Sequence, residues 1–147
     1  MPVSAGPYQT DFPPVDFETW QLAAEAVYGY HDHVDAGEAL KALDLFTSDA
    51  VVELPGRTVE GTSQLEDFLT SRQAKTDRVT MHILNNLRVV QIADDEYAVK
   101  TLTLVYLVKD GAKEFEGLIG VNWHVRKEGD RFLISRRVRL VKDGDGH

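Results

Sequence analysis

The side chains best suited to acid–base chemistry are those of Asp35 and His82, which come from two distant segments of the sequence. Asp35 stands at the end of a predicted helix, just before Gly37, and His82 lies in a predicted strand. A carboxylate that accepts a hydrogen bond from one imidazole nitrogen fixes the ring tautomer and leaves the other nitrogen as a base near neutral pH. In an apolar pocket, such a pair can remove a proton from carbon or oxygen.

Tyr30 and Arg139 are the other candidate catalytic residues. Tyr30 lies at the edge of the apolar face of the same helix, where its phenol can donate a hydrogen bond to a substrate carbonyl or leaving group. Arg139, near the end of the last predicted strand, can stabilise oxyanion charge or bind a substrate carboxylate. His31 widens the same helix face, and the sequence leaves open whether His31 or His82 faces the pocket. The predicted substrate-binding residues are Trp20, Tyr106, Trp123 and Asn86.

Each candidate also has an ordinary structural explanation. A single histidine on a strand is more often a core or rim residue than a base, and large aromatic side chains are core residues by default. Asp35 is equally explained as a polar helix end, and Arg139 as part of a solvated strand face. Taken one at a time, these residues are therefore compatible with a functional role and with an ordinary structural role.

Composition narrows the choice of function. The chain has 147 residues, a net charge of −8 and no cysteine, which excludes disulfides, thiolate nucleophiles and cysteine-based zinc sites. The negative charge disfavours nucleic acid as a partner, because phosphate binding needs a basic face. The arginines of segment 136–139 divide between the two faces of an alternating strand. We therefore expect a small hydrophobic ligand and no nucleic acid.

Several motifs are absent from the sequence. It holds no phosphate-binding loop, nucleophile elbow, dinucleotide fingerprint or His-Glu-x-x-His, and its five histidines lack metal-ligand spacing. The prediction is a site with no cofactor and no metal. No apolar run approaches about 18 residues, and the N-terminal stretch lacks the layout of a signal peptide. This predicts a cytoplasmic protein with no membrane association.

Hydrophobic periodicity predicts three helices near the N-terminus. The first starts after Asp16 as N-cap and stops before Gly37. A short second helix covers 38–46, and a third opens at 61–63, with Thr62 or Ser63 as its cap. The apolar stripe of the first helix, at spacings of three and four, consists of Trp20, Ala23, Val27, Tyr30 and Val34.

The rest of the domain is predicted to be strands. Tight-turn signals separate four long segments with a period of two, which predicts an antiparallel meander that twists and curls. Helices on its concave face would enclose a pocket. If alternation is unbroken, His82 and Asn86 share one face, as do Ser135, Arg137 and Arg139, with Ile134 on the other. The predicted strands are 51–54, 58–60, 79–92, 96–108, 113–126 and 131–141.

The predicted domain organisation is simple. Residues 1–14 contain four of the five prolines and are predicted to be a flexible arm. Residues 15–142 form a single domain, since a chain of this length supports one core. Residues 143–147 are a polar and mobile tail.

The pattern resembles the SnoaL-like branch of the nuclear transport factor 2-like superfamily. The resemblance is carried by Tyr30-x4-Asp35 before a glycine, a Val-Val-Glu-Leu strand, and Thr80-Met81-His82-x3-Asn86. It implies an α+β fold, a cone-shaped barrel of a curved, mostly antiparallel sheet packed against three N-terminal helices, and a homodimer or homotrimer. The enzymes it most resembles are bile-acid 7α-dehydratase and scytalone dehydratase, together with hexachlorocyclohexane dehydrochlorinase.

The resemblance also implies a reaction. In those enzymes an Asp–His pair removes a proton during an elimination, and Asp35 and His82 match the pair. Arg139, within Val-Arg-Leu, resembles a C-terminal Val-Arg-Ile segment of the bile-acid enzyme. The dehydrochlorinase has a lysine where Tyr30 stands, and scytalone dehydratase uses a histidine and an asparagine not found at matching places here. The expected function is a lyase or isomerase acting on a steroid-like or polyketide-like ring; the alternative is a non-catalytic module resembling a ring-hydroxylating dioxygenase small subunit.

Overall fold

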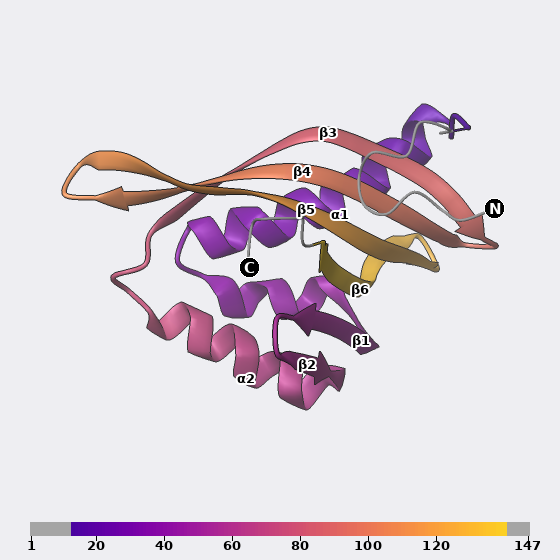
Figure 1. The fold of residues 1–147 in the computed structure, drawn as a ribbon. Helices are drawn as coiled ribbons and strands as arrows, with labels where there is room; N and C mark the ends of the chain where they lie inside the picture. Colours follow the sequence, from indigo (N-terminus) through magenta and orange to yellow (C-terminus); the bar gives the residue numbers. More distant parts are fainter. Residues whose placement is uncertain (1–12, 141–147) are drawn as a thin grey trace.

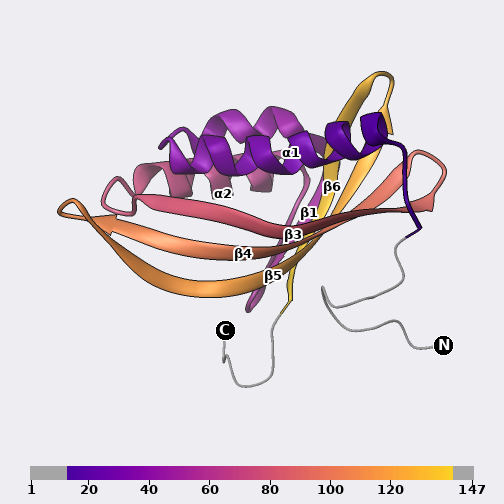
Figure 2. The ribbon, with the colours of Figure 1, turned by 90° about the horizontal axis from the view of Figure 1, so that it is seen from above.

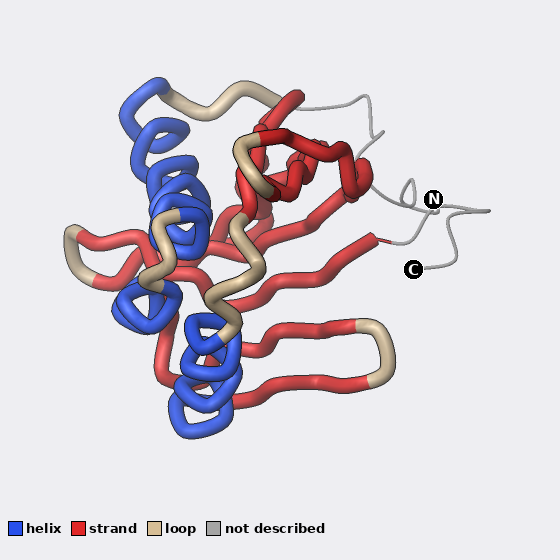
Figure 3. The backbone as a smooth tube through the Cα atoms, turned by 90° about the vertical axis from the view of Figure 1, so that its left-hand side faces the viewer, coloured by secondary structure: helices blue, strands red, loops and turns tan. Residues whose placement is uncertain are grey.

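One curved sheet and the helices that cover its inner face make up the fold (Figures 1 and 2). The structure is a computed structural model that describes residues 13–140. The predicted tail at 143–147, and all of the predicted arm except residues 13 and 14, lie outside the described residues. Figure 3 shows the helices gathered on one side of the strands. No helix in the described part is both long and apolar enough to cross a membrane.

The first helix, α1 (Phe17–Asp35), begins where the sequence predicts. The side chain of Asp16 accepts a hydrogen bond from the backbone N–H of Thr19 at 2.7 Å, which confirms Asp16 as the N-cap. The buried stripe includes Val27, Tyr30 and Val34. The helix stops ahead of Gly37, whose φ of +79° suits a residue without a Cβ.

Two shorter helices follow α1 and flank a hairpin. The first, η1 (Ala39–Leu45), is a 3₁₀ helix, and the second is α2 (Gly61–Ala74). The predicted cap of α2 was wrong, because strand β2 (Arg57–Glu60) runs up to Glu60, which takes the N-cap position in an extended conformation. The Gln64 side chain accepts the backbone N–H of Glu60 at 2.9 Å, while Thr62 donates to the carbonyl of Ser48.

The six strands of the described residues are β1 (Phe46–Leu54), β2 (Arg57–Glu60), β3 (Thr80–Ala93), β4 (Glu96–Lys109), β5 (Ala112–Glu128) and β6 (Arg131–Leu140). They form one mixed sheet in the order β2-β1-β6-β5-β4-β3. Pairs β3–β4, β4–β5, β5–β6 and β1–β2 are antiparallel, and β1–β6 is parallel. Within the described residues, the sheet does not close on itself, since β2 and β3 remain its two edges. The expected curved α+β fold is therefore confirmed, as an open cone.

The core lies between α1 and the inner face of the long strands. Trp123 is its largest fully buried side chain, and Val99, Val121 and Val125 are fully buried beside it. Burying an aliphatic side chain contributes about 1.5–3 kcal/mol, so this layer fixes the helix against the sheet. It also fixes the positions of polar residues at the ends of the same elements.

Two irregularities in strand pairing change which residues face inward. In β3 the register shifts between Asn85 and Arg88, and Asn86 has a φ of 51°. Asn86 is exposed, so the predicted shared face of His82 and Asn86 was wrong beyond this bulge. In β6 a shift opposite His124 and Val125 places Ile134 on the inner face together with Arg137.

Candidate active site

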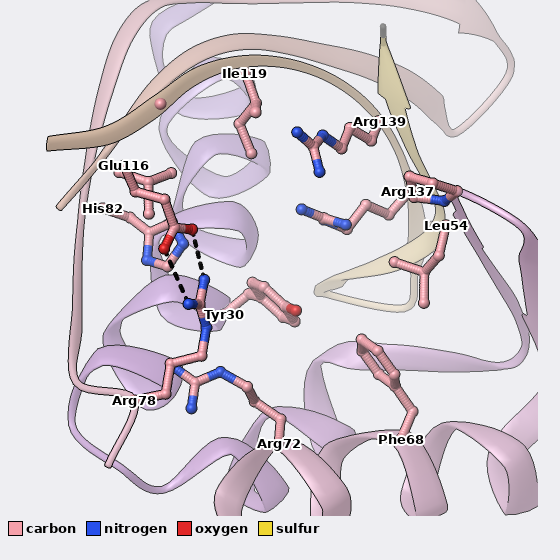
Figure 4. A pocket seen from close by; sticks show the side chains of 13 residues that line it. Tyr30, Leu54, Phe68, Arg72, Arg78, His82, Glu116, Ile119, Arg137 and Arg139 are labelled. Carbon is pink, nitrogen blue, oxygen red and sulfur yellow. Dashed lines mark hydrogen bonds and ion pairs between the residues drawn. The ribbon is translucent and has the colours of Figure 1, made fainter. Parts of the chain in front are cut away.

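A cavity of about 570 Å³ opens between the helices and the inner face of the sheet. Figure 4 shows His82 on one side of this cavity, Arg137 and Arg139 on the opposite side, and the ring of Tyr30 between them. The sequence predicted a hydrophobic cavity wall. The structure differs, because charged side chains project into the cavity. The lining residues are Tyr30, Leu54, Pro55, Phe68, Arg72, Arg78, His82, Val105, Glu116, Gly117, Ile119, Arg137 and Arg139.

Asp35 and His82 are in direct contact. The distance between Asp35 Oδ1 and His82 Nδ1 is 2.6 Å, and the backbone N–H of His82 donates to Asp35 Oδ2 at 2.8 Å. The hydroxyl of Thr80 donates to Asp35 Oδ1 at 2.8 Å. The end of α1 and the start of β3 are thus joined through one carboxylate. With Nδ1 engaged by Asp35, the Nε2 atom of His82 is the ring nitrogen available to act on a ligand.

The environment of Asp35 keeps it ionised. Burial raises its pKa, but the hydrogen bonds and charge of His82 and the hydrogen bond from Thr80 outweigh burial and hold the pKa below 3.8. Arg72 extends the network by donating to the Thr80 hydroxyl at 3.1 Å. The carboxylate is therefore anionic at neutral pH and aligned to orient the imidazole.

His31 lies behind His82 rather than in the cavity wall. The two rings stack with centroids 4.5 Å apart and planes 28° apart. His31 is only 3% exposed, and neither ring nitrogen has a hydrogen-bond partner within the described part of the chain. Burial lowers the pKa of His31 well below 6.5, and His82 and Arg137 lower it further. His31 is therefore a neutral packing partner of His82.

Tyr30 is packed by aromatic edges on three sides. Its ring centroid lies 5.4 Å from Trp123, 5.8 Å from Phe46 and 5.2 Å from His31. The residue is 7% exposed and lines the cavity, where its hydroxyl end is visible in Figure 4. Trp123, with no exposed surface, supports this ring from behind instead of lining the cavity. The phenol is held at the centre of the site with little rotational freedom.

The remaining predicted binding residues lie elsewhere. Trp20 packs near the start of α1 and lines a separate hollow with Phe17. Tyr106 packs its ring against Phe115 on β5 and does not line the cavity. Asn86 is exposed at the bulge in β3. The structure thus brings together Asp35, His82, Tyr30 and Arg139, and separates them from these three residues.

Sequence reasoning missed four charged residues of the cavity wall. Arg72 comes from α2, Arg78 from the segment before β3, Glu116 from β5, and Arg137 from β6. Arg78 and Glu116 form a two-fold hydrogen-bonded ion pair at 2.9 and 2.6 Å. The only sequence signal was the run of arginines at 136–139. Within residues 13–140, no three His, Asp or Glu side chains are placed to hold a metal ion.

The chain is similar to known proteins in both sequence pattern and fold. The SnoaL-like domain family matches residues 23–138, whereas no curated protein matches the sequence. An NTF2-like protein with a cystatin-like fold from Novosphingobium aromaticivorans has a TM-score of 0.74 at 18% identity, over 88% of this chain and 85% of that one.

Two further solved structures from Novosphingobium aromaticivorans share the fold. A proposed aromatic ring hydroxylase has a TM-score of 0.74 at 21% identity, over 88% of this chain and 93% of its own. A proposed scytalone dehydratase has a TM-score of 0.69 at 18% identity, over 85% of each chain. Identities this low establish the fold alone. Because the family match spans most of its length, the chain belongs to the SnoaL-like domain family.

Proposed function

We propose that this protein is a dehydratase-like lyase or isomerase that needs no cofactor and acts on a ring compound. The observation that carries the proposal is the 2.6 Å contact between Asp35 and His82 in the wall of a cavity large enough for a small molecule. Neighbours described as a proposed scytalone dehydratase and a proposed aromatic ring hydroxylase support a ring-shaped substrate, such as a steroid or polyketide.

The proposed reaction is an elimination or a proton shift that starts at His82. With Nδ1–H donating to Asp35, Nε2 accepts a proton from a substrate carbon next to a carbonyl. The electron pair of the broken C–H bond forms an enolate. In an elimination this pair then forms a double bond as the neighbouring hydroxyl takes the proton from His82 Nε2 and leaves as water, whereas in a proton shift Nε2 returns the proton to another ring carbon. Tyr30 or Arg139 stabilises the developing charge.

The test is a comparison of two histidine variants on a panel of hydroxylated steroid-like and polyketide-like ring compounds. For a compound that the protein converts, His82→Gln should lower kcat by about 10²-fold or more, because it removes the general base. His33→Gln is the matched control, since it makes the same substitution on α1, at a histidine that does not line the cavity. Full activity of His82→Gln on a converted compound would refute the mechanism.

A non-catalytic role is the second candidate, and the outer face of the sheet favours it. Apolar side chains on β3 and β5 are exposed there, 40% for Met81, 44% for Ile83, 58% for Phe115 and 40% for Leu118. An exposed apolar patch of this kind is typical of a protein interface. We propose that this face pairs copies of the chain into a homodimer or homotrimer, and light scattering measures that oligomeric state. Alternatively, the face binds a larger partner as a dioxygenase small subunit would. Co-purification with an iron-containing chain would support this non-catalytic role.

A further inference from the structure

We infer that the cavity binds a cyclic ligand that carries a carboxylate, and that Arg137 and Arg139 hold this carboxylate on the side opposite His82. The inference rests on the proposed function, because it names the chemical class of the substrate that His82 would act on. Among the charged side chains of the cavity wall, positive groups outnumber negative ones. Four lining side chains are arginines, and one is a glutamate.

Two of the four arginines already have partners. Arg78 is paired with Glu116 through two hydrogen bonds. Arg72 donates to Thr80, and burial and the charge of Arg78 lower its pKa while the charge of Asp35 raises it. These two groups therefore belong to the structure around the Asp35–His82 pair, and they leave Arg137 and Arg139 to be explained.

Arg137 and Arg139 form no ion pair or hydrogen bond within residues 13–140. The Nε atoms of both are buried and have no hydrogen-bond partner in that part of the chain. The hydrogen bond with Arg78 lowers the pKa of Glu116 most, and the charge of Arg139 lowers it to a smaller extent. The Glu116 carboxylate is thus hydrogen-bonded to Arg78 and not to Arg139. Both guanidinium groups point into the cavity in Figure 4, where a ligand would meet them together.

Burial makes the unpaired charge of Arg137 informative. The residue is 8% exposed, and its guanidinium lies 5.1 Å from the ring centre of Trp123 and 5.8 Å from that of Tyr30. Cation–π contacts offset part of the desolvation cost, but a buried charge ordinarily also has a hydrogen-bonded counter-ion. A carboxylate in the cavity would supply that counter-ion, and guanidinium matches carboxylate geometry with paired hydrogen bonds.

The topology sets the shape of such a ligand. Strands β5 and β4 lie between β6, which carries the arginines, and β3, which carries His82. At about 4.8 Å between neighbouring strands, the backbones of β6 and β3 are at most about 14 Å apart across the curved sheet, so one ligand can reach side chains of both strands. On these two intervening strands, the apolar residues Val105 of β4 and Ile119 of β5 line the cavity, which suits a ring. The carboxylate then anchors one end while a ring carbon faces His82.

The test measures ligand binding to the full chain by calorimetry, without turnover. The probes are naphthoate, the neutral naphthamide of the same shape, and naphthyl phosphate. We expect naphthoate to bind about tenfold or more tightly than naphthamide. A hydrogen bond to a charged group contributes more free energy than a tenfold change in affinity requires. Added salt should weaken naphthoate binding and leave naphthamide binding nearly unchanged.

Three arginine variants locate the site. Arg137→Met and Arg139→Met should each weaken naphthoate binding about tenfold and remove its preference over naphthamide. Arg136→Met is the matched control, because Arg136 is exposed on the same strand and bonded to Glu53. If Arg137→Met fails to fold, as judged by thermal melting, Arg139→Met still decides the question.

Several results would overturn the inference. They are failure of the carboxylate probe to bind, equal affinity for naphthoate and naphthamide, unchanged binding in both cavity variants, or tighter binding of naphthyl phosphate. His82→Gln separates this inference from the proposed function, since it should retain naphthoate binding. Retained carboxylate binding with no dependence of turnover on His82 would refute the mechanism alone.

Discussion

Replacing Asp35 with asparagine tests how the site and the fold are coupled. The carboxylate accepts three hydrogen bonds, from the Thr80 hydroxyl, the backbone N–H of His82 and the His82 ring. Asparagine keeps the shape but has one accepting oxygen in place of two, and it is neutral. At least one of these donors must therefore face the amide NH₂ group.

The cost follows from these contacts. A hydrogen bond to a charged group contributes about 1.5–3 kcal/mol, and leaving a buried donor unsatisfied costs about 1–3 kcal/mol. Asp35 is 24% exposed, so water recovers part of the loss. We expect Asp35→Asn to lower the free energy of unfolding by about 2–4 kcal/mol at neutral pH. At typical slopes for small proteins, this moves the urea midpoint by about 1–2 M.

The pH dependence gives a second, independent check. The pKa of Asp35 in the folded protein lies below 3.8, so an unfolded chain takes up this proton at a higher pH than the folded chain does. The stabilisation by Asp35 is fully present above pH 3.8 and is lost as the pH falls through the folded pKa. The difference between wild type and Asp35→Asn should therefore shrink below about pH 4.

Urea unfolding of both proteins, followed by far-UV circular dichroism from neutral pH to about pH 3, measures the difference. Titration of groups distant from Asp35 cancels in the comparison. Asp32→Asn is the control, because Asp32 is exposed on the same helix and should change stability by no more than about 0.5 kcal/mol. Equal stability of wild type and Asp35→Asn, or a difference that persists unchanged into acid, would refute the reasoning.

Two further substitutions probe the residues behind the site. Since the pKa of buried His31 lies well below 6.5, the unfolded chain binds a proton first and stability falls as the pH drops below 6.5. His31→Phe should reduce that fall, and urea midpoints that keep the wild-type dependence below pH 6.5 would contradict this. Trp123→Ala removes the largest fully buried side chain and should cost about 3–5 kcal/mol, measured by the same unfolding assay. A loss below about 1 kcal/mol would show that the core refills the space.

Local signals in the sequence were sufficient for the elements themselves. Asp16 caps α1 because its side chain reaches a backbone N–H three residues later, a contact that depends only on neighbouring residues. Gly37 ends the helix for an equally local reason. The alternating segments became strands close to their predicted bounds, since a period of two is set along the chain.

The register of pairing between strands could not be predicted from the sequence pattern. A bulge adds one residue to one strand and reverses the facing of every residue after it, and its position depends on the neighbouring strand. The bulges therefore turned Asn86 to solvent and placed Ile134 with Arg137 on the inner face. For the same reason, the predicted binding role of Asn86 lost its geometric basis.

The sequence by itself determined the helix that carries Tyr30 and Asp35, the strand that carries His82, and the order of the elements. Only the tertiary structure decided that Asp35 and His82 meet at 2.6 Å, that His31 stays behind them, and that arginines line the opposite wall. The physical reason is distance along the chain. Periodicity records which face of each element is buried, whereas the charge of a cavity is the sum of side chains from segments that folding brings together.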